Sequence, residues 1–215
     1  MSEFENTDFS CEYKVISQKP GEQQSVYHLR LFRRDSEDKF LLLILKPEVD
    51  KGKGYLQVGE NTWSYDPESR EFAHFSMKDN FEDSEAKNRD FKALSYAEDY
   101  SIIGDEQGTL GKYDVYILTL EGKHEDVVYP KIKMWIRQDN HLLLKEEDYS
   151  LSDRLMRTLY YPSYMKVRDR YIPSKILIID NLKEGEKTQI TISDPSLAQL
   201  PDYVFTKSYL ERVNR

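Results

Sequence analysis

The chain lacks several features that common protein classes require. It has one cysteine, Cys11, in 215 residues, which excludes an internal disulfide framework and a zinc site built from thiolates. Its longest apolar run, Phe40–Leu45, is far shorter than the roughly 20 residues of a membrane-spanning helix. Only 31 Lys and Arg stand against 39 Asp and Glu, which argues against nucleic acid or a membrane surface as the main partner.

Motifs for catalysis and metal binding are also missing. The histidines are scattered along the chain, at His28, His74, His124 and His141. There is no nucleophile elbow, phosphate loop or dinucleotide glycine fingerprint, and Lys51–Gly54 precedes a predicted strand, which favours a turn. The acidic runs Glu82–Glu85 and Glu146–Asp148 are interpreted as solvated faces. We therefore expect no catalytic residue, no metal and no cofactor.

What the sequence does contain is typical of β structure. Sixteen tyrosines and an aromatic content of 13% favour strands, and 39% apolar residues favour a folded chain. Period-two alternation between turn signals predicts strands over residues 9–17, 25–33, 39–46, 55–58, 62–65, 72–77, 113–120, 127–137, 141–149, 155–161, 165–168, 171–179 and 187–192.

Helical signals are few. Residues 79–100 are predicted as a helical insertion, since three apolar residues recur there at a spacing of three: Phe91, Leu94 and Ala97. A short helix is predicted over 206–213, with Thr206 as its N-cap. No linker interrupts the pattern. We therefore expect a single domain over 1–215 of the mostly β class: one curved antiparallel sheet of about ten or more strands, forming an open barrel.

Such a sheet has an apolar face that must be covered. In the predicted strand 131–137, Ile132, Met134 and Ile136 share one face. The helical material is too small to cover the apolar faces of so many strands. Two explanations remain open: the sheet fills its own core, or the surplus apolar surface holds an apolar ligand.

A motif in the middle of the chain resembles a known family. Gly59–Arg70 follows the pattern G-x-N-x-W-x-Y-x-P-x-x-R, which resembles the outer-membrane lipoprotein-sorting proteins, the LolA-like family. Further matches follow in order along the chain, at Asp90-Phe91, Tyr129–Lys131, Arg170–Pro173 and Pro201–Arg212. The resemblance spans roughly residues 9 to 212.

The resemblance implies a LolA/LolB-like half-barrel bent around a hydrophobic cavity, with helices as a lid or plug. It implies a periplasmic carrier of phospholipid or acylated lipoprotein that is destined for the outer membrane, with the signal peptide absent from this chain. Its partners would include an inner-membrane export machinery and an outer-membrane acceptor. We expect no nucleic acid partner and a monomeric protein.

Two sets of residues are expected to form the binding site. The predicted lipid-binding wall comprises Leu42, Ile44, Leu56, Trp63, Tyr65, Phe75, Leu118, Ile132, Met134, Ile136 and Leu177. Trp63 and Tyr65 are also suited to anchoring the core of their hairpin. The predicted lid residues are Arg34, Met77, Phe91 and Leu94. The role of Arg34 follows from the resemblance, because the family's lid is held by an arginine on an early strand.

Two other functions remain open. A lipid acyl hydrolase would need a nucleophile and a base near the same cavity, and Ser64, Ser76 and His74 are the available side chains. An envelope or adhesion protein would instead use exposed strand edges and the tyrosine-rich surface.

Overall fold

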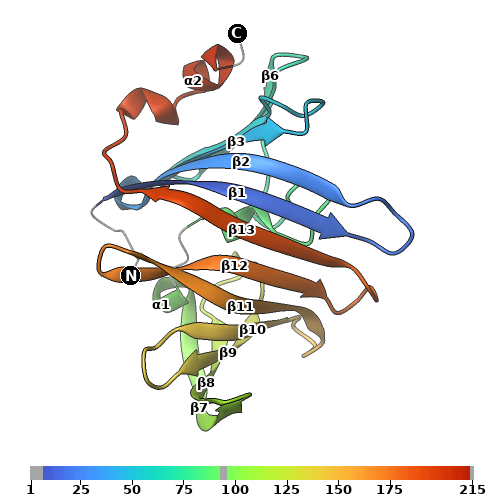
Figure 1. Ribbon diagram of the computed structural model, residues 1–215, viewed down its shortest axis with the longest axis vertical. Coiled ribbons are helices and arrows are strands. Elements are labelled where there is room, and N and C mark those ends of the chain that lie inside the picture. The colour runs from blue at the N-terminus through green and yellow to red at the C-terminus, as the bar shows by residue number, and fades with distance from the viewer. Residues whose placement is uncertain (1–6, 93–95, 214–215) are drawn as a thin grey trace. The chain divides into compact units, whose positions relative to one another are not determined.

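The computed structural model describes residues 7–92 and 96–213. Within these residues, thirteen strands form one open antiparallel sheet with the order β6-β5-β4-β3-β2-β1-β13-β12-β11-β10-β9-β8-β7 (Figure 1). The strands are β1 (Asp8–Gln18), β2 (Ser25–Arg34), β3 (Lys39–Lys46), β4 (Gly54–Val58), β5 (Asn61–Asp66), β6 (Glu71–Ala73), β7 (Tyr100–Leu110), β8 (Tyr113–Gly122), β9 (Lys131–Arg137), β10 (Leu143–Tyr149), β11 (Leu155–Val167), β12 (Arg170–Asp180) and β13 (Lys187–Ser196). The predicted fold class is confirmed.

Helical structure is sparse in the described part of the chain. It consists of η1 (Asp35–Glu37), η2 (Asn88–Phe91), α1 (Tyr96–Asp99), η3 (Asp202–Phe205) and α2 (Lys207–Arg212). The Thr206 side chain accepts a hydrogen bond from the Tyr209 N–H, which confirms the predicted N-cap of α2. A helix that is both long and apolar enough to cross a membrane is absent from the described residues.

The chain divides into two compact units, which are described separately below. The first comprises Met1–Ser17, Gln24–Leu94 and Ile190–Arg215, and the second comprises Gln18–Gln23 and Ser95–Gln189. The single domain expected over 1–215 stays a prediction.

The elements differ from the sequence prediction in several places. β6 ends at Ala73, so residues 74–77 of the predicted strand 72–77 are not in a strand. A strand, β7, occupies 100–110, where no strand was predicted, because it is exposed along most of its length and therefore lacks an apolar alternation. The predicted strands 155–161 and 165–168 are one strand, β11, whose register with β12 shifts on either side of Ser163, next to Pro162. Residues 79–87 are irregular rather than helical.

Candidate functional site

In the first unit, the central strand β3 is covered on both faces. Leu41 and Leu42 point to opposite faces of the sheet, and each is at most 1% exposed. This explains why the run Phe40–Leu45 is continuously apolar rather than alternating. The two faces have different covers and are described in turn.

The first face, here called the helix-covered face, lies under η3 and α2. It joins Leu41, Leu56, Trp63 and Tyr65 from the strands to Val204, Phe205 and Leu210 from the cover. The cover approaches closely at Gly54 of β4, where an added Cβ would overlap the Leu210 side chain. Phe72, the register neighbour of Tyr65, also packs against this cluster.

Arg34, at the end of β2, clamps the start of this cover. Its guanidinium donates two hydrogen bonds to Asp8, with Nε–Oδ1 at 2.8 Å and Nη2–Oδ2 at 3.0 Å. It also donates to Asp202 Oδ1 at 2.5 Å, to the Leu200 carbonyl at 2.6 Å and to Glu37 at 3.4 Å. All five guanidinium N–H groups are thereby engaged. Arg34 therefore connects β2 to the segment that leads into η3.

The clamp determines the electrostatics of an adjacent cavity of about 470 Å³. Burial opposes ionisation of Asp8, but hydrogen bonds from Arg34 and from the Leu200 N–H hold its pKa below its usual range. The cavity is lined mainly by Thr7, Asp8, Arg34, Glu37, Gln199 and Asp202. This lining is polar, so the cavity does not suit an acyl chain. Because the Arg34 donors are already engaged, it does not suit an anion either.

The opposite face, here called the loop-covered face, carries Leu42 and Ile44. Register pairs place Leu31 and Tyr55 beside Leu42, and Leu29 beside Ile44. The cover here is the segment 75–91, which is irregular up to residue 87 and ends in η2. It adds three phenylalanines that make ring contacts with Tyr13, Tyr27 and Tyr55 of the sheet: Phe75, Phe81 and Phe91.

The backbone of this covering segment is folded on itself. Phe81 N–H donates to the Ala86 carbonyl at 2.7 Å, and Asn88 N–H donates to the Asp79 carbonyl at 3.0 Å. Short polar side chains take part, since Ser84 Oγ donates to the Phe81 carbonyl at 2.6 Å. Such bonds compete with helix formation and explain the irregular conformation. The segment is held to the sheet by ring contacts and by hydrogen bonds from Tyr55 Oη to Glu82 at 2.5 Å and from Thr62 Oγ1 to the Phe75 carbonyl at 2.6 Å.

The second unit has one apolar face of its own. Leu118, Leu120, Ile132 and Met134 lie on adjacent strands in register and share this face, with Ile136 at its margin. The residues that pack over it are mostly tyrosines: Tyr96, Tyr100 and Tyr129. We call it the tyrosine-covered face. Its cover comes from α1, the start of β7 and the segment before β9.

Two carboxyl groups are buried at the edge of the tyrosine-covered face. Glu146 and Asp148 of β10 lie opposite Met134 and Ile132 of β9, and they are 3% and 0% exposed. Asp148 accepts a hydrogen bond from Arg157 at 2.6 Å. Burial, and then the neighbouring Asp148 charge, raise the pKa of Glu146 well above its usual range. Burial therefore favours the neutral, protonated form of Glu146, whose carboxyl lies beside that of Asp148.

The prediction that Glu146–Asp148 is a solvated run is thus wrong for its two outer members. The side chains alternate along β10, so Glu147 faces away from the pair and binds Lys145 at 2.6 Å. Tyr96 Oη of α1 donates to Glu146 at 2.6 Å, which connects the cover to the carboxyl pair. The alternation Leu144-Lys145-Glu146-Glu147-Asp148 gives no apolar signal for burial, so sequence reasoning missed this cluster.

The predicted wall residues do not share one surface. Leu42 and Ile44 lie on the loop-covered face, whereas Leu56, Trp63 and Tyr65 lie on the helix-covered face. In the second unit, Leu118, Ile132, Met134 and Ile136 come together on the tyrosine-covered face. Leu177 does not join them, because its register neighbours are Tyr160, Lys145 and Trp135 on the other side of the sheet. The buried residue in line with Met134 is Ile178.

The predicted lid residues lie in two places. Phe91 is 1% exposed and belongs to the segment over the loop-covered face, together with the half-buried Phe75 and Met77. Arg34 is buried at the C-terminal cover. Leu94 lies outside the described residues.

Two of the three side chains considered for a hydrolase bind backbone carbonyls, and the third, Ser76, accepts the Lys78 N–H with its Oγ at 3.1 Å. Ser64 Oγ donates to the Ala73 carbonyl at 3.3 Å, and His74 Nδ1 lies 2.8 Å from the Thr62 carbonyl. Cys11 is buried in β1, and burial raises the pKa of its thiol to about 12, which makes it a poor nucleophile.

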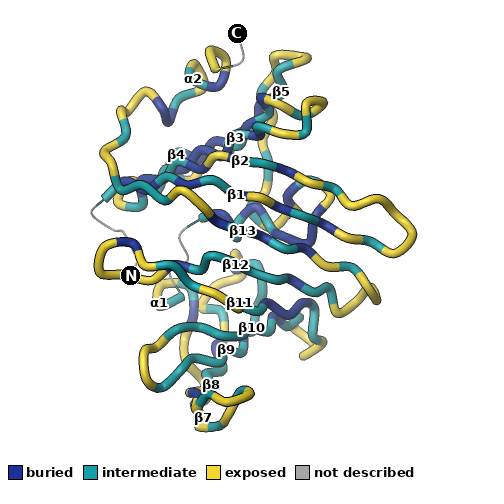
Figure 2. Tube along the Cα trace, in the orientation of Figure 1, coloured by how far each residue is buried: buried dark blue, intermediate teal, exposed yellow. Residues whose placement is uncertain are grey.

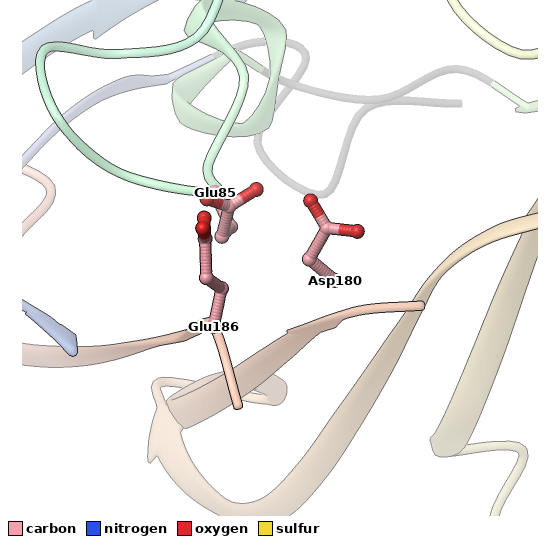
Figure 3. Close-up of side chains that lie close together, drawn as sticks. All are labelled: Glu85, Asp180 and Glu186. Atoms are coloured by element: carbon pink, nitrogen blue, oxygen red, sulfur yellow. The ribbon is translucent and has the colours of Figure 1, made fainter. Parts of the chain in front are cut away.

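Figure 3 shows an acidic group that includes Asp180 and Glu186, at the two ends of the β12–β13 turn. Both take part in closing that turn. Asp180 Oδ1 accepts the Leu182 N–H at 2.6 Å, and Lys183 Nζ donates to Glu186 at 3.2 Å. The third side chain drawn, Glu85, belongs to the other compact unit. These contacts explain why Asp180 and Glu186 lie at the turn, since each carboxylate binds a residue of the turn itself.

Solved structures share this architecture. A LolA superfamily protein from Nitrosomonas europaea is 26% identical, with a TM-score of 0.82, over 94% of this chain and 91% of that chain. An outer membrane lipoprotein-sorting protein domain from Vibrio parahaemolyticus is 22% identical, with a TM-score of 0.83, over 96% and 92%. A DUF1329 family protein from Desulfovibrio piger is 22% identical, with a TM-score of 0.84, over 95% and 91%.

The open sheet and these matches define a LolA-like protein with a carrier-type fold, which confirms the resemblance drawn from the sequence. A family model with the description "uncharacterized protein" matches residues 36–212, and the chain belongs to that family. No curated protein matches the chain.

Proposed function

We propose that this protein is a periplasmic carrier that shields the acyl chains of a phospholipid or an acylated lipoprotein on their way to the outer membrane. Its partners would be a donor machinery in the inner membrane and an acceptor in the outer membrane, and it would act as a monomer without catalysis. The similarity to the LolA superfamily and to a lipoprotein-sorting domain supports this proposal.

The observation that carries the proposal is the nature of the cover over Leu42 and Ile44. A segment that is folded on itself, and held to the sheet largely by aromatic rings, can be displaced as a unit without breaking sheet hydrogen bonds. Displacement would expose an apolar sheet face. Each acyl CH₂ group removed from water contributes about 0.8 kcal/mol, so one chain supplies on the order of 10 kcal/mol before ordering costs.

The first experiment is native mass spectrometry of the purified protein, followed by organic extraction and lipid identification. Phospholipid or acylated peptide at near one per chain would support the proposal. Fatty acid and lysolipid that accumulate on incubation would instead indicate a lipid acyl hydrolase. An empty protein that takes up no fluorescent acyl probe would overturn the carrier function and favour an envelope-binding protein.

A matched pair of variants tests the loop-covered face. Tyr55→Phe keeps the ring but removes the hydrogen bond to Glu82 in the covering segment. Tyr27→Phe also keeps its ring contact with Phe81, but it loses a hydrogen bond to Asp50, which lies outside that segment. A hydrogen bond to a charged group stabilises by about 1.5–3 kcal/mol, so Tyr55→Phe should speed acyl-probe uptake by about tenfold or more. Tyr27→Phe should leave uptake unchanged, and equal rates in both variants would contradict the assignment.

A further inference from the structure

The strand β7 presents a long backbone edge to solvent. It pairs with β8 from Tyr100↔Gly122 to Leu110↔Tyr113, and it is the last strand in the sheet order of the described residues. Most of its residues are exposed (Figure 2). The strand at the opposite end of that order, β6, has only three residues, which is the usual way to limit an exposed edge. β7 has eleven residues and is not limited in this way.

The edge also exposes two apolar side chains to solvent. Ile102 and Ile103 are 63% and 53% exposed. The register shifts between Ile102 and Gly104, so Ile103 is an extra residue in a β-bulge. The regular part of the edge therefore runs from Gly104 to Leu110, with two exposed isoleucines at its start.

The β7–β8 hairpin carries mostly negative charge. Residues 100–122 contain four carboxylates and one lysine: Asp105, Glu106, Asp114, Glu121 and Lys112. Asp105 and Glu106 lie at the middle of β7 and are exposed, one toward each face of the sheet. Antiparallel pairing of two β7 strands about their centres would place these carboxylates opposite one another, which is destabilising. The charge disfavours a second copy of the chain and favours a basic strand.

We propose that β7 is a docking edge for an extended, basic peptide segment of another protein. The segment adds a strand along Gly104–Leu110, where backbone hydrogen bonds supply affinity. Its Lys or Arg side chains lie against Asp105 and Glu106, and an apolar side chain at its end contacts Ile102 and Ile103. This site is independent of the lipid-carrier function, since it uses the backbone edge and the exposed side chains of β7 rather than the buried residues of the three covered faces.

The probe is a fluorescent nine-residue Thr/Lys peptide with two adjacent central lysines, one for each face of the sheet, and an isoleucine at one end. It is added to the full chain at physiological salt. Fluorescence anisotropy should detect binding, and hydrogen exchange should slow at amides within Gly104–Leu110. A peptide with the same side chains but N-methylated at alternate residues should bind at least tenfold more weakly, because it cannot complete the strand. Absence of binding at millimolar peptide, or equal binding of the N-methylated peptide, would overturn the proposal.

Charge variants distinguish peptide binding at this edge from nonspecific attraction of a basic peptide to an acidic protein. The double variant Asp105→Lys, Glu106→Lys should lose at least tenfold in affinity for the Lys peptide and gain binding of a Thr/Glu peptide. The matched control is Asp169→Lys, Glu184→Lys, which makes the same charge change at two exposed residues outside the β7–β8 hairpin. Equal losses in both double variants would overturn the proposal, as would slowed exchange at β7 caused by self-association without peptide.

Discussion

The Arg34 side chain holds several segments of the chain together. It binds Asp8, Asp202 and the Leu200 carbonyl at once, and a lysine has neither the planar fork nor enough donors to replace it. We expect Arg34→Lys to lower the free energy of unfolding by about 2 kcal/mol or more, and Arg34→Ala by about 3–5 kcal/mol. Urea unfolding at pH 7 measures both.

The control for Arg34 is a second arginine on the same strand. Arg30 pairs with Glu12, but both side chains are exposed, so Arg30→Lys should cost less than about 1 kcal/mol. Because the pKa of Asp8 is lowered in the folded chain, the stabilisation from its pair with Arg34 is present at neutral pH. It is lost as the pH falls through the folded pKa of Asp8. The difference between wild type and Arg34→Lys should therefore shrink in acid, and a constant difference would contradict the ion pair.

Glu146 gives a pH dependence of the opposite sign. Its pKa is raised by burial and by Asp148, so the folded chain keeps a proton that the unfolded chain releases. Stability is thus present below the ordinary glutamate pKa and is lost as the pH rises toward the folded pKa. Glu146→Gln keeps an acceptor for Tyr96 and cannot ionise. We expect its unfolding free energy to fall less than that of wild type between pH 5 and pH 9.

The neighbouring residue provides the control for Glu146. Glu147 lies on the other side of β10 and pairs with Lys145, so Glu147→Gln should follow the wild-type pH profile. If Glu146→Gln also followed that profile, the raised pKa of Glu146 would be wrong. Thermal unfolding in matched buffers gives both profiles.

At the scale of elements, the contact between β4 and α2 can be tested directly. Gly54 lies under Leu210, which is fully buried, so a Cβ at position 54 must displace that side chain. We expect Gly54→Ala to cost about 1–3 kcal/mol from overpacking. In a Leu210→Ala background the same change should cost much less, since the space is then open. Equal costs in the two backgrounds, measured by urea unfolding, would exclude this close approach.

Sequence periodicity predicts some of the elements correctly and misses others. Strands with one solvated face, such as β9 with Ile132 and Met134, carry the period-two signal and were predicted. β7 carries no such signal, because an exposed edge strand buries neither face. The segment 79–87 has helical composition, but the Ser84 side chain binds the backbone around it, and Asn88 and Asp90 just beyond it bind the backbone of the same covering segment. Only the tertiary environment selects that conformation over a helix.

For the whole molecule, the proposed carrier function predicts that cargo stabilises the folded chain. A ligand at one hundred times its Kd stabilises the folded state by about 2.7 kcal/mol, which for a chain of this length raises Tm by about 5–10 °C. We expect this shift with a triacylated peptide and no shift with the same peptide lacking acyl chains. Differential scanning calorimetry measures both, and equal shifts would show that the acyl chains are not what is bound.

Alternation, turn residues and caps are local signals, and they were enough to predict the mostly β class, the open sheet and the N-cap of α2. The motif resemblance added the LolA-like family. Tertiary structure decided which apolar residues meet. Leu42 and Leu56 read alike in sequence but face different covers, and Leu177 is displaced by one residue from the buried Ile178. A shift of one residue reverses the face of every side chain, so register separates these groups. The hydrogen bond from Tyr96 to Glu146 and the clamp of Arg34 on Asp8 and Asp202 likewise join residues that are distant in sequence.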